Sequence, residues 1–207
     1  MGIKILITPN YGTNCYLLEN ESSAAVIDPG EITPELMKFA EEQKHKQNKL
    51  IILTHCHFDH IGGVEAVKQI WNCSVLIGED EAEGLIDNRI NLSGIWTPEK
   101  ISITPDKTVC DGDIIELGED TLKVISTRGH TAGSVCYLCD NILFSGDTLF
   151  RMSIGRTDLP TGDYNSLLCS LRKLSELPRD ITVLSGHGPR TAIGFELDNN
   201  PYLKKDR

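Results

Sequence analysis

The sequence predicts an α+β protein in which two β-sheets pack face to face and helices cover both outer faces of the pair. In the first half of the chain, short apolar segments typical of strands alternate with segments that have the period of amphipathic helices. The second half opens with short strands separated by Asp/Gly turns and closes with a leucine-rich helix and a strand. Elements of both kinds in each half, with hairpins between them, suit a four-layer αββα sandwich. At 207 residues the chain is expected to form one domain, residues 1–207, with a sizeable core.

Turn residues and apolar periodicity place the individual elements. Strands are expected at residues 3–7, 14–18, 24–27, 50–53, 74–77, 114–117, 122–125, 135–138, 142–145 and, as the last one, 181–184. Helices are expected from Pro34, capped by Thr33, to about Lys46, from near Gly62 to Trp71, near residues 80–86, and after the capping residue Asp163. Periodicity is lost between residues 88 and 98, and the charged tail from Lys204 to Arg207 is expected to fray.

Composition narrows the class of partner. The formal net charge of −10, with no block of Lys or Arg, disfavours nucleic acid and anionic membranes as partners. No apolar run approaches the roughly 20 residues that span a bilayer. The segment Met1–Ile7 is typical of a strand rather than a signal peptide, and no small-residue cleavage site follows it. We therefore expect a cytoplasmic protein whose partner is a small molecule, and the oligomeric state stays open.

The seven cysteines are scattered and odd in number, which is not typical of a disulfide framework. We expect free thiols. Cys136 and Cys139 form a C-x-x-C pair, but they fall in an expected strand, where residues three apart face opposite sides. No second pair accompanies them, so we interpret them as packing residues.

The most informative segment is residues 54–63, Thr-His-Cys-His-Phe-Asp-His-Ile-Gly-Gly, which directly follows the apolar strand at 50–53. If the chain stays extended past Thr54, His55 and His57 point the same way, because side chains two apart share a strand face. Asp59 and His60 then lie on the turn into the next helix and point elsewhere. The segment therefore offers ligands to two adjacent metal positions, and imidazole with carboxylate suits zinc, iron or manganese.

Three further polar residues follow expected strands, and each has a glycine directly before it: His130, Asp147 and His187. A glycine lets the backbone approach closely where a side chain would clash. Five of the six histidines are thereby placed at strand ends. The sixth, His45, lies on the polar face of a helix and is expected to be solvated. These positions complete a candidate metal site.

The motif His-x-His-x-Asp-His followed by Gly-Gly, with Gly-His, Gly-Asp and Gly-His in order after it, resembles the metallo-β-lactamase superfamily, the αββα hydrolases that hold one or two metals. The resemblance implies that His55, His57 and His130 hold a first metal. It assigns a second metal to Asp59, His60 and His187, and a bridging position to Asp147. Asp28, in the turn Asp-Pro-Gly, would lie behind the metals and orient a ligand histidine, although a simple turn is an equal alternative. Two zinc ions are expected, with iron or manganese as alternatives.

The segments Gly-Asp-Thr-Leu-Phe and Gly-His-Gly-Pro are similar to those of the glyoxalase II group, the hydroxyacylglutathione hydrolases. This implies hydrolysis of thioesters such as S-2-hydroxyacylglutathione by a metal-bridging hydroxide, which Asp59 would help to orient. The chain lacks the helical extension that longer members carry for glutathione, and Asp158 stands where an aromatic residue is expected. Arg156 can contact substrate, but a local ion pair with Asp158 is an equal alternative.

Other functions stay open. The run Gly-Arg-Thr-Asp also occurs in persulfide dioxygenases, which use a single iron, so a mononuclear iron enzyme is one alternative. A metallohydrolase that acts on another small ester is a second. A metal-binding scaffold without turnover is a third. Oxygen uptake with glutathione persulfide and thioester turnover distinguish among these alternatives.

Overall fold

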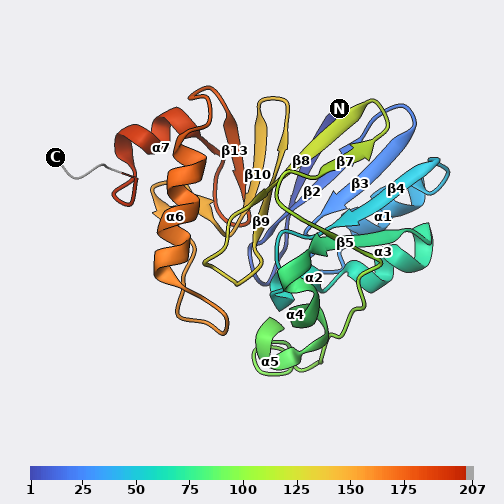
Figure 1. Ribbon diagram of the computed structural model, residues 1–207. Helices are drawn as coiled ribbons and strands as arrows, with labels where there is room; N and C mark the ends of the chain where they lie inside the picture. Colours follow the sequence, from blue (N-terminus) through green and yellow to red (C-terminus); the bar gives the residue numbers. More distant parts are fainter. Residues whose placement is uncertain (204–207) are drawn as a thin grey trace.

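The computed structural model of the chain describes residues 1–203, and the tail expected to fray, from Lys204 to Arg207, lies outside the described residues. Figure 1 shows two β-sheets packed together between two helical layers. Helices α6 (Tyr164–Ser175) and α7 (Ile193–Asn199) cover one outer face, and α1 (Pro34–Gln43) and α3 (Val64–Trp71) cover the other. The predicted αββα sandwich is confirmed.

The first sheet has the strand order β1-β2-β3-β4-β5-β6. The first three strands are antiparallel, and the strands from β3 to β6 run parallel, with α1 and α3 in the crossovers. Their bounds are β1 (Gly2–Ile7), β2 (Asn14–Glu19), β3 (Ser23–Ile27), β4 (Asn48–Ile52), β5 (Ser74–Gly78) and β6 (Lys107–Val109).

The second sheet has the order β14-β13-β10-β9-β8-β7. Helix α6 is the crossover between the parallel strands β10 and β13, and the other pairs are antiparallel. The bounds are β7 (Ile114–Leu117), β8 (Asp120–Ser126), β9 (Val135–Cys139), β10 (Ile142–Gly146), β13 (Thr182–Ser185) and β14 (Thr191–Ala192). A small separate hairpin is formed by β11 (Leu149–Phe150) and β12 (Ser153–Ile154).

Three apolar clusters separate the four layers. Strand β4 and the residue after it illustrate the pattern, because Ile51 and Leu53 pack toward α1 and α3 while Leu50 and Ile52 pack toward the second sheet. The continuous apolar run at 50–53 is therefore the mark of a strand buried on both faces. A third cluster lies between the second sheet and α6.

Local signals account for the ends of the main helices. The Thr33 side chain accepts the Leu36 N–H at 3.1 Å, and Pro34 occupies the first helical position, where its missing N–H costs nothing. Asp163 caps α6 in the same way through the Ser166 N–H at 2.6 Å. The inward leucines predicted for α6 are buried at 167, 171 and 174, whereas Leu168 is only half-buried.

Several boundaries differ from the prediction. Helix α1 ends at Gln43 rather than near Lys46. Asp59 and His60 lie in a separate one-turn helix, α2 (Phe58–Ile61), rather than on a turn. Strand β13 is not the last, since β14 and α7 follow it. The apolar pattern of α7 is interrupted by the fully buried Glu196, which accepts hydrogen bonds from Thr191 and from the Met152 N–H.

Between β5 and β6 the chain forms η1 (Glu79–Glu81), α4 (Ala82–Ile86) and α5 (Asn88–Asn91), of which only the helix at 80–86 was predicted. The cysteines are free thiols, and both Cys136 and Cys139 are buried, as their packing role requires. Within residues 1–203, none of the helices combines the length and apolar character needed to cross a membrane.

Candidate metal centre

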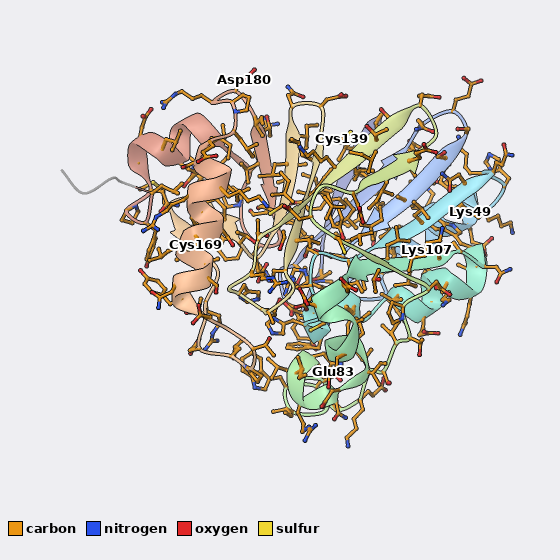
Figure 2. All side chains as sticks on the ribbon, viewed as in Figure 1. Lys49, Glu83, Lys107, Cys139, Cys169 and Asp180 are labelled. Atoms are coloured by element: carbon orange, nitrogen blue, oxygen red, sulfur yellow. The ribbon has the colours of Figure 1, made fainter. Side chains whose placement is uncertain are left out.

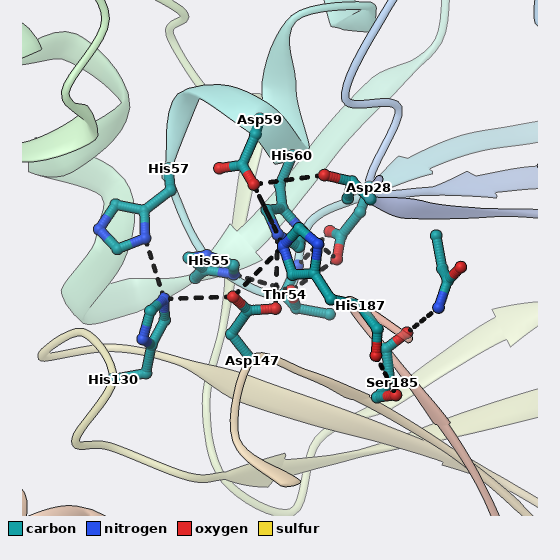
Figure 3. Close-up of polar contacts among 12 residues, drawn as sticks. Asp28, Thr54, His55, His57, Asp59, His60, His130, Asp147, Ser185 and His187 are labelled. Carbon is teal, nitrogen blue, oxygen red and sulfur yellow. Dashed lines mark hydrogen bonds and ion pairs between the residues drawn. The ribbon is translucent and has the colours of Figure 1, made fainter. Parts of the chain in front are cut away.

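The topology gathers the candidate ligands at one edge of the sandwich. The segments that carry them follow the carboxyl ends of β3 and β4 in one sheet and of β8, β10 and β13 in the other. Strands β8, β10 and β13 run in the same direction, because β9 is antiparallel to both β8 and β10, and β13 is parallel to β10. Side chains that are far apart in sequence therefore meet at this edge (Figure 3).

Asp28 holds the loop after β4 in place through hydrogen bonds to Thr54 and His60. It is 1% exposed, and its backbone is left-handed (φ 50°), as the turn after β3 requires. Its Oδ1 accepts the Thr54 N–H at 2.8 Å, and its Oδ2 accepts the Thr54 hydroxyl at 2.7 Å. The same Oδ2 lies 3.0 Å from Nδ1 of His60. With Nδ1 donating to this carboxylate, His60 presents the lone pair of Nε2 to the site.

The first cluster contains His55, His57 and His130, whose candidate ligand atoms all lie within 4.8 Å of one another. The nearest pair is Nδ1 of His57 and Nε2 of His130, 2.9 Å apart, which is close enough for both to bind one ion. His130 donates through Nδ1 to the carbonyl of Arg156 at 2.7 Å, which leaves its Nε2 free to bind. Nδ1 of His55 lies 3.1 Å from the Thr54 hydroxyl oxygen, which accepts because its own hydrogen goes to Asp28.

The second cluster contains Asp59, His60 and His187, again with candidate ligand atoms within 4.8 Å. Oδ2 of Asp59 lies 3.2 Å from Nε2 of His187 and 3.7 Å from Nε2 of His60. The Thr13 hydroxyl donates to the same Oδ2 at 3.2 Å. Thr13 also forms a β-bridge with His187, so the turn between β1 and β2 places both of these candidate ligands.

Asp147 lies between the two clusters (Figure 3). Its Oδ1 is 3.5 Å from Nε2 of His60, and its Oδ2 is 3.6 Å from Nε2 of both His130 and His187. A Cβ at Gly186 would lie 2.1 Å from Oδ1 of Asp147, which explains the glycine before His187. One carboxylate thus reaches both clusters, as a bridging ligand must.

Unpaired buried atoms show that this donor set fits metal ions. Nε2 of His55 and His60 and Oδ1 of Asp147 are buried and have no hydrogen-bond partner. Groups of this kind are rare in folded proteins unless a ligand or ion satisfies them. Nitrogen and carboxylate donors at this spacing are the set that zinc and iron accept.

The charges of the site favour a cation. Burial and the neighbouring His130 lower the pKa of His57 to about 3, so its imidazole stays neutral, which is the form that binds metal. Burial opposes protonation of His60, yet the carboxylates of Asp59, Asp147 and Asp28 raise its pKa to about 10. Burial likewise opposes ionisation of Asp59, but His60 and His187 lower its pKa well below the usual range. The carboxylates therefore stabilise positive charge at this position.

A buried carboxylate that sequence reasoning missed joins the two ligand loops. Glu81 is 2% exposed, its Oε2 accepts the Cys56 N–H at 2.9 Å, and its Oε1 accepts the Gly133 N–H at 2.7 Å. Cys56 itself packs against α4, since a Cβ at Gly84 would lie 2.5 Å from its sulfur. Burial and Glu81 raise the pKa of the Cys56 thiol well above its usual value, which excludes a thiolate ligand.

A pocket of about 370 Å³ opens over the clusters. Besides five of the candidate ligands and Ser153, its lining includes residues that the sequence did not identify, namely Phe58, Leu92, Trp96, Phe150, Ile154 and Leu159. Arg156 lines it too, but its guanidinium makes two hydrogen bonds of 2.7 Å to Asp158, so the ion pair given above as the alternative to substrate contact is present. His45 is exposed and belongs to none of the candidate metal groups of residues 1–203.

The chain has extensive similarity to known proteins. Residues 8–187 match the family model described as the metallo-β-lactamase superfamily. The probable metallo-hydrolase YqgX of Bacillus subtilis (strain 168) is 37% identical over 194 residues, which cover 92% of each chain. The hydroxyacylglutathione hydrolase GloC of Haemophilus influenzae (strain ATCC 51907 / DSM 11121 / KW20 / Rd) is 33% identical over 210 residues, which cover 98% of each.

Solved structures agree with the sequence matches. The BLEG-1 B3 metallo-β-lactamase superposes with a TM-score of 0.90 at 38% identity, covering 99% of this chain and 100% of that one. TTHA1623 in a di-iron-bound form superposes with a TM-score of 0.84 at 30% identity, covering 97% of this chain and 100% of that one. ETHE1 from Myxococcus xanthus superposes with a TM-score of 0.78 at 27% identity, covering 97% of this chain and 84% of that one. The chain belongs to the metallo-β-lactamase superfamily.

Proposed function

We propose that this protein is a metal-dependent thioester hydrolase of the glyoxalase II type, acting on S-2-hydroxyacylglutathione or related small thioesters. The observation that carries the proposal is the position of Asp147 between a cluster of three histidines and a cluster of one aspartate and two histidines, at the floor of an open pocket. The similarity to a hydroxyacylglutathione hydrolase over 98% of the chain supports the same reaction.

In this proposal His55, His57 and His130 would hold one ion, Asp59, His60 and His187 would hold a second, and Asp147 would serve both sites. Zinc is proposed for both positions, with iron or manganese as alternatives. When bound, such ions lower the pKa of a bound water and polarise a carbonyl oxygen. Asp28 fixes the ring of His60, and the Arg156 carbonyl fixes the ring of His130.

The chain's own groups then orient the reactants. Asp59 lines the pocket, and its low pKa keeps it anionic, so it can accept a hydrogen bond from the attacking water and aim the water's lone pair at the thioester carbonyl. The water oxygen bonds to the carbonyl carbon, and the carbon–sulfur bond breaks. The products are a carboxylic acid and a thiol. Because a thiolate leaves readily (its usual pKa is about 8.5), no dedicated general acid is required of the pocket.

A second candidate function is β-lactam hydrolysis, which also adds water to a carbonyl. It is favoured by the 38% identity to a B3 metallo-β-lactamase over 99% of the chain. A chromogenic cephalosporin assayed beside the thioesters separates the two activities.

A mononuclear iron persulfide dioxygenase is a further alternative, supported by the run Gly-Arg-Thr-Asp, which resembles a segment of such enzymes. The complete second cluster argues against it, since a single-iron enzyme needs only one ligand set. Oxygen uptake with glutathione persulfide tests it directly.

The deciding experiment measures the metal content of natively purified protein together with thiol release from a panel of thioesters. We expect more than one transition-metal ion per chain and thiol release that a chelator abolishes. Metal-loaded protein that leaves every thioester intact would contradict the proposal.

A further inference from the structure

The segment after α5 (Asn88–Asn91) builds one wall of the pocket over the candidate metal centre. Leu92 is 4% exposed and adopts a left-handed backbone (φ 67°), which is uncommon for a residue of its size. Trp96 lies beyond it, and its ring centroid is 6.0 Å from that of Phe58 in an edge-to-face arrangement. Phe58 packs edge-to-face on Tyr11 at 5.0 Å. We call Phe58, Leu92 and Trp96 the apolar wall.

This segment is held rigidly by Asn91, which is fully buried. Its Nδ2 donates to the carbonyls of Gly84 and Ile101, each at 3.1 Å, and its Oδ1 accepts the N–H and the hydroxyl of Ser93 at 2.9 and 2.6 Å. The backbone N–H of Trp96 donates to the Leu92 carbonyl at 3.1 Å. Asn91 therefore ties the start of the segment to α4 through Gly84 and to the returning chain at Ile101. A strained backbone at Leu92 is the kind of feature that recurs where a site must be preorganised.

Trp96 is 52% exposed even though it is held in place. A large aromatic surface kept open to water beside a candidate catalytic centre is unfavourable until an apolar group covers it. Beyond the candidate ligands, three more apolar side chains, Phe150, Ile154 and Leu159, line the pocket beside Ser153 and Arg156.

The charges of the pocket also favour an uncharged group over an anionic one. Arg156 is the only Lys or Arg among the described lining residues. Its guanidinium is paired with both carboxylate oxygens of Asp158, and its Cζ lies 5.8 Å from the Trp96 ring. Asp158 thus occupies two of the guanidinium's nitrogens, and its negative charge opposes the approach of a carboxylate of a glutathione tail.

We propose that the apolar wall is the acyl-group subsite, and that the enzyme selects thioesters with an aromatic or branched apolar acyl group over those with small or charged groups. This inference rests on the proposed thioester hydrolysis and deepens it. Contacts of this size discriminate between substrates by roughly tenfold to a hundredfold in kcat/KM.

The test compares phenylacetyl and acetyl thioesters of one uncharged carrier, N-acetylcysteamine, and the same phenylacetyl group on glutathione. The wild-type protein should prefer phenylacetyl over acetyl by at least about tenfold in kcat/KM and should discriminate little between the two carriers. Trp96→Ala should remove the preference by slowing only the phenylacetyl ester, and Trp96→Phe should retain most of it. Ile95→Ala is the matched control, because Ile95 is adjacent, 61% exposed and absent from the pocket lining.

A second measurement does not depend on turnover. The two tryptophans of the chain are Trp96 and Trp71, and Trp71 is only 3% exposed. Binding of the non-hydrolysable thioether analogue of the phenylacetyl ester should change the fluorescence of wild-type protein and not that of Trp96→Phe.

The outcomes separate this inference from the proposed function. Equal turnover of the acetyl and phenylacetyl esters, or an equal loss on both in Trp96→Ala, overturns the subsite and leaves thioester hydrolysis standing. Metal-loaded protein that hydrolyses none of the three esters overturns the proposed function. A normal thermal unfolding midpoint and metal content of Trp96→Ala confirm that the variant is folded.

Discussion

The Glu81 carboxylate accepts the backbone N–H of Cys56 at 2.9 Å, between the two histidines of the first ligand loop. Its other oxygen accepts the Gly133 N–H, three residues after His130. A single buried side chain thus sets the distance between the two loops that supply the first cluster.

Glu81→Ala should weaken metal binding at the first cluster by roughly 10- to 100-fold, because it leaves two buried N–H groups without an acceptor and frees the loops to separate. The measurement is competitive titration of zinc or cobalt into apo-protein. Glu83→Ala is the matched control, because Glu83 lies nearby on α4, is exposed, and is labelled in Figure 2. Equal affinities of Glu81→Ala and wild type would show that the hydrogen bonds of Glu81 to the two loops do not position the ligands.

Asp147→Asn should reduce the metal content of both clusters together, because its carboxylate lies within 3.6 Å of ligand nitrogens in both clusters and its charge screens the two cations from each other. Metal analysis after dialysis against a weak chelator checks this. His45→Gln is the control, since His45 is exposed and outside the site, and it should leave metal content and turnover unchanged. Loss of one ion only from Asp147→Asn would contradict the bridging role.

Asp158→Ala should lower the KM for glutathione thioesters several-fold by releasing Arg156 to bind a substrate carboxylate. Arg156 lowers the pKa of Asp158 to about 2, so the pair persists throughout the usual assay range and acid cannot substitute for the mutation. The double variant Asp158→Ala/Arg156→Ala should not show this lowered KM. If Asp158→Ala alone does not alter the KM, Arg156 does not reach the carrier.

Metal-free protein should become less stable as the pH rises from about 6.5 to about 10. His60 has a pKa of about 10 in the folded state, against its usual 6.5, so its protonation stabilises the fold fully below 6.5, and this stabilisation is lost as the pH rises through 10. Urea unfolding of chelated protein across this range measures the effect, with His60→Asn as the variant that should lack it. A flat profile in the chelated wild type would contradict the assignment of the proton to His60.

The sequence predicted the αββα fold because its main strands and helices have clear periods, as the run at 50–53 and the inward leucines of α6 illustrate. It also placed the seven candidate ligands, because each follows a strand within a short Gly- or His-rich motif. Glu81 could not be found in this way, since Glu79-Asp80-Glu81 has the composition of a solvated helix start and its partners are distant in sequence. The apolar wall was missed because Leu92 and Trp96 lie where periodicity is lost, and their positions depend on hydrogen bonds made by Asn91.

The most direct test of the account is thiol release from a thioester, measured while zinc is titrated into apo-protein. Two clusters that share Asp147 predict that activity rises until about two equivalents per chain are bound and then stays constant. Full activity at one equivalent, or no thiol release from protein that holds two ions, would contradict a dinuclear thioester hydrolase.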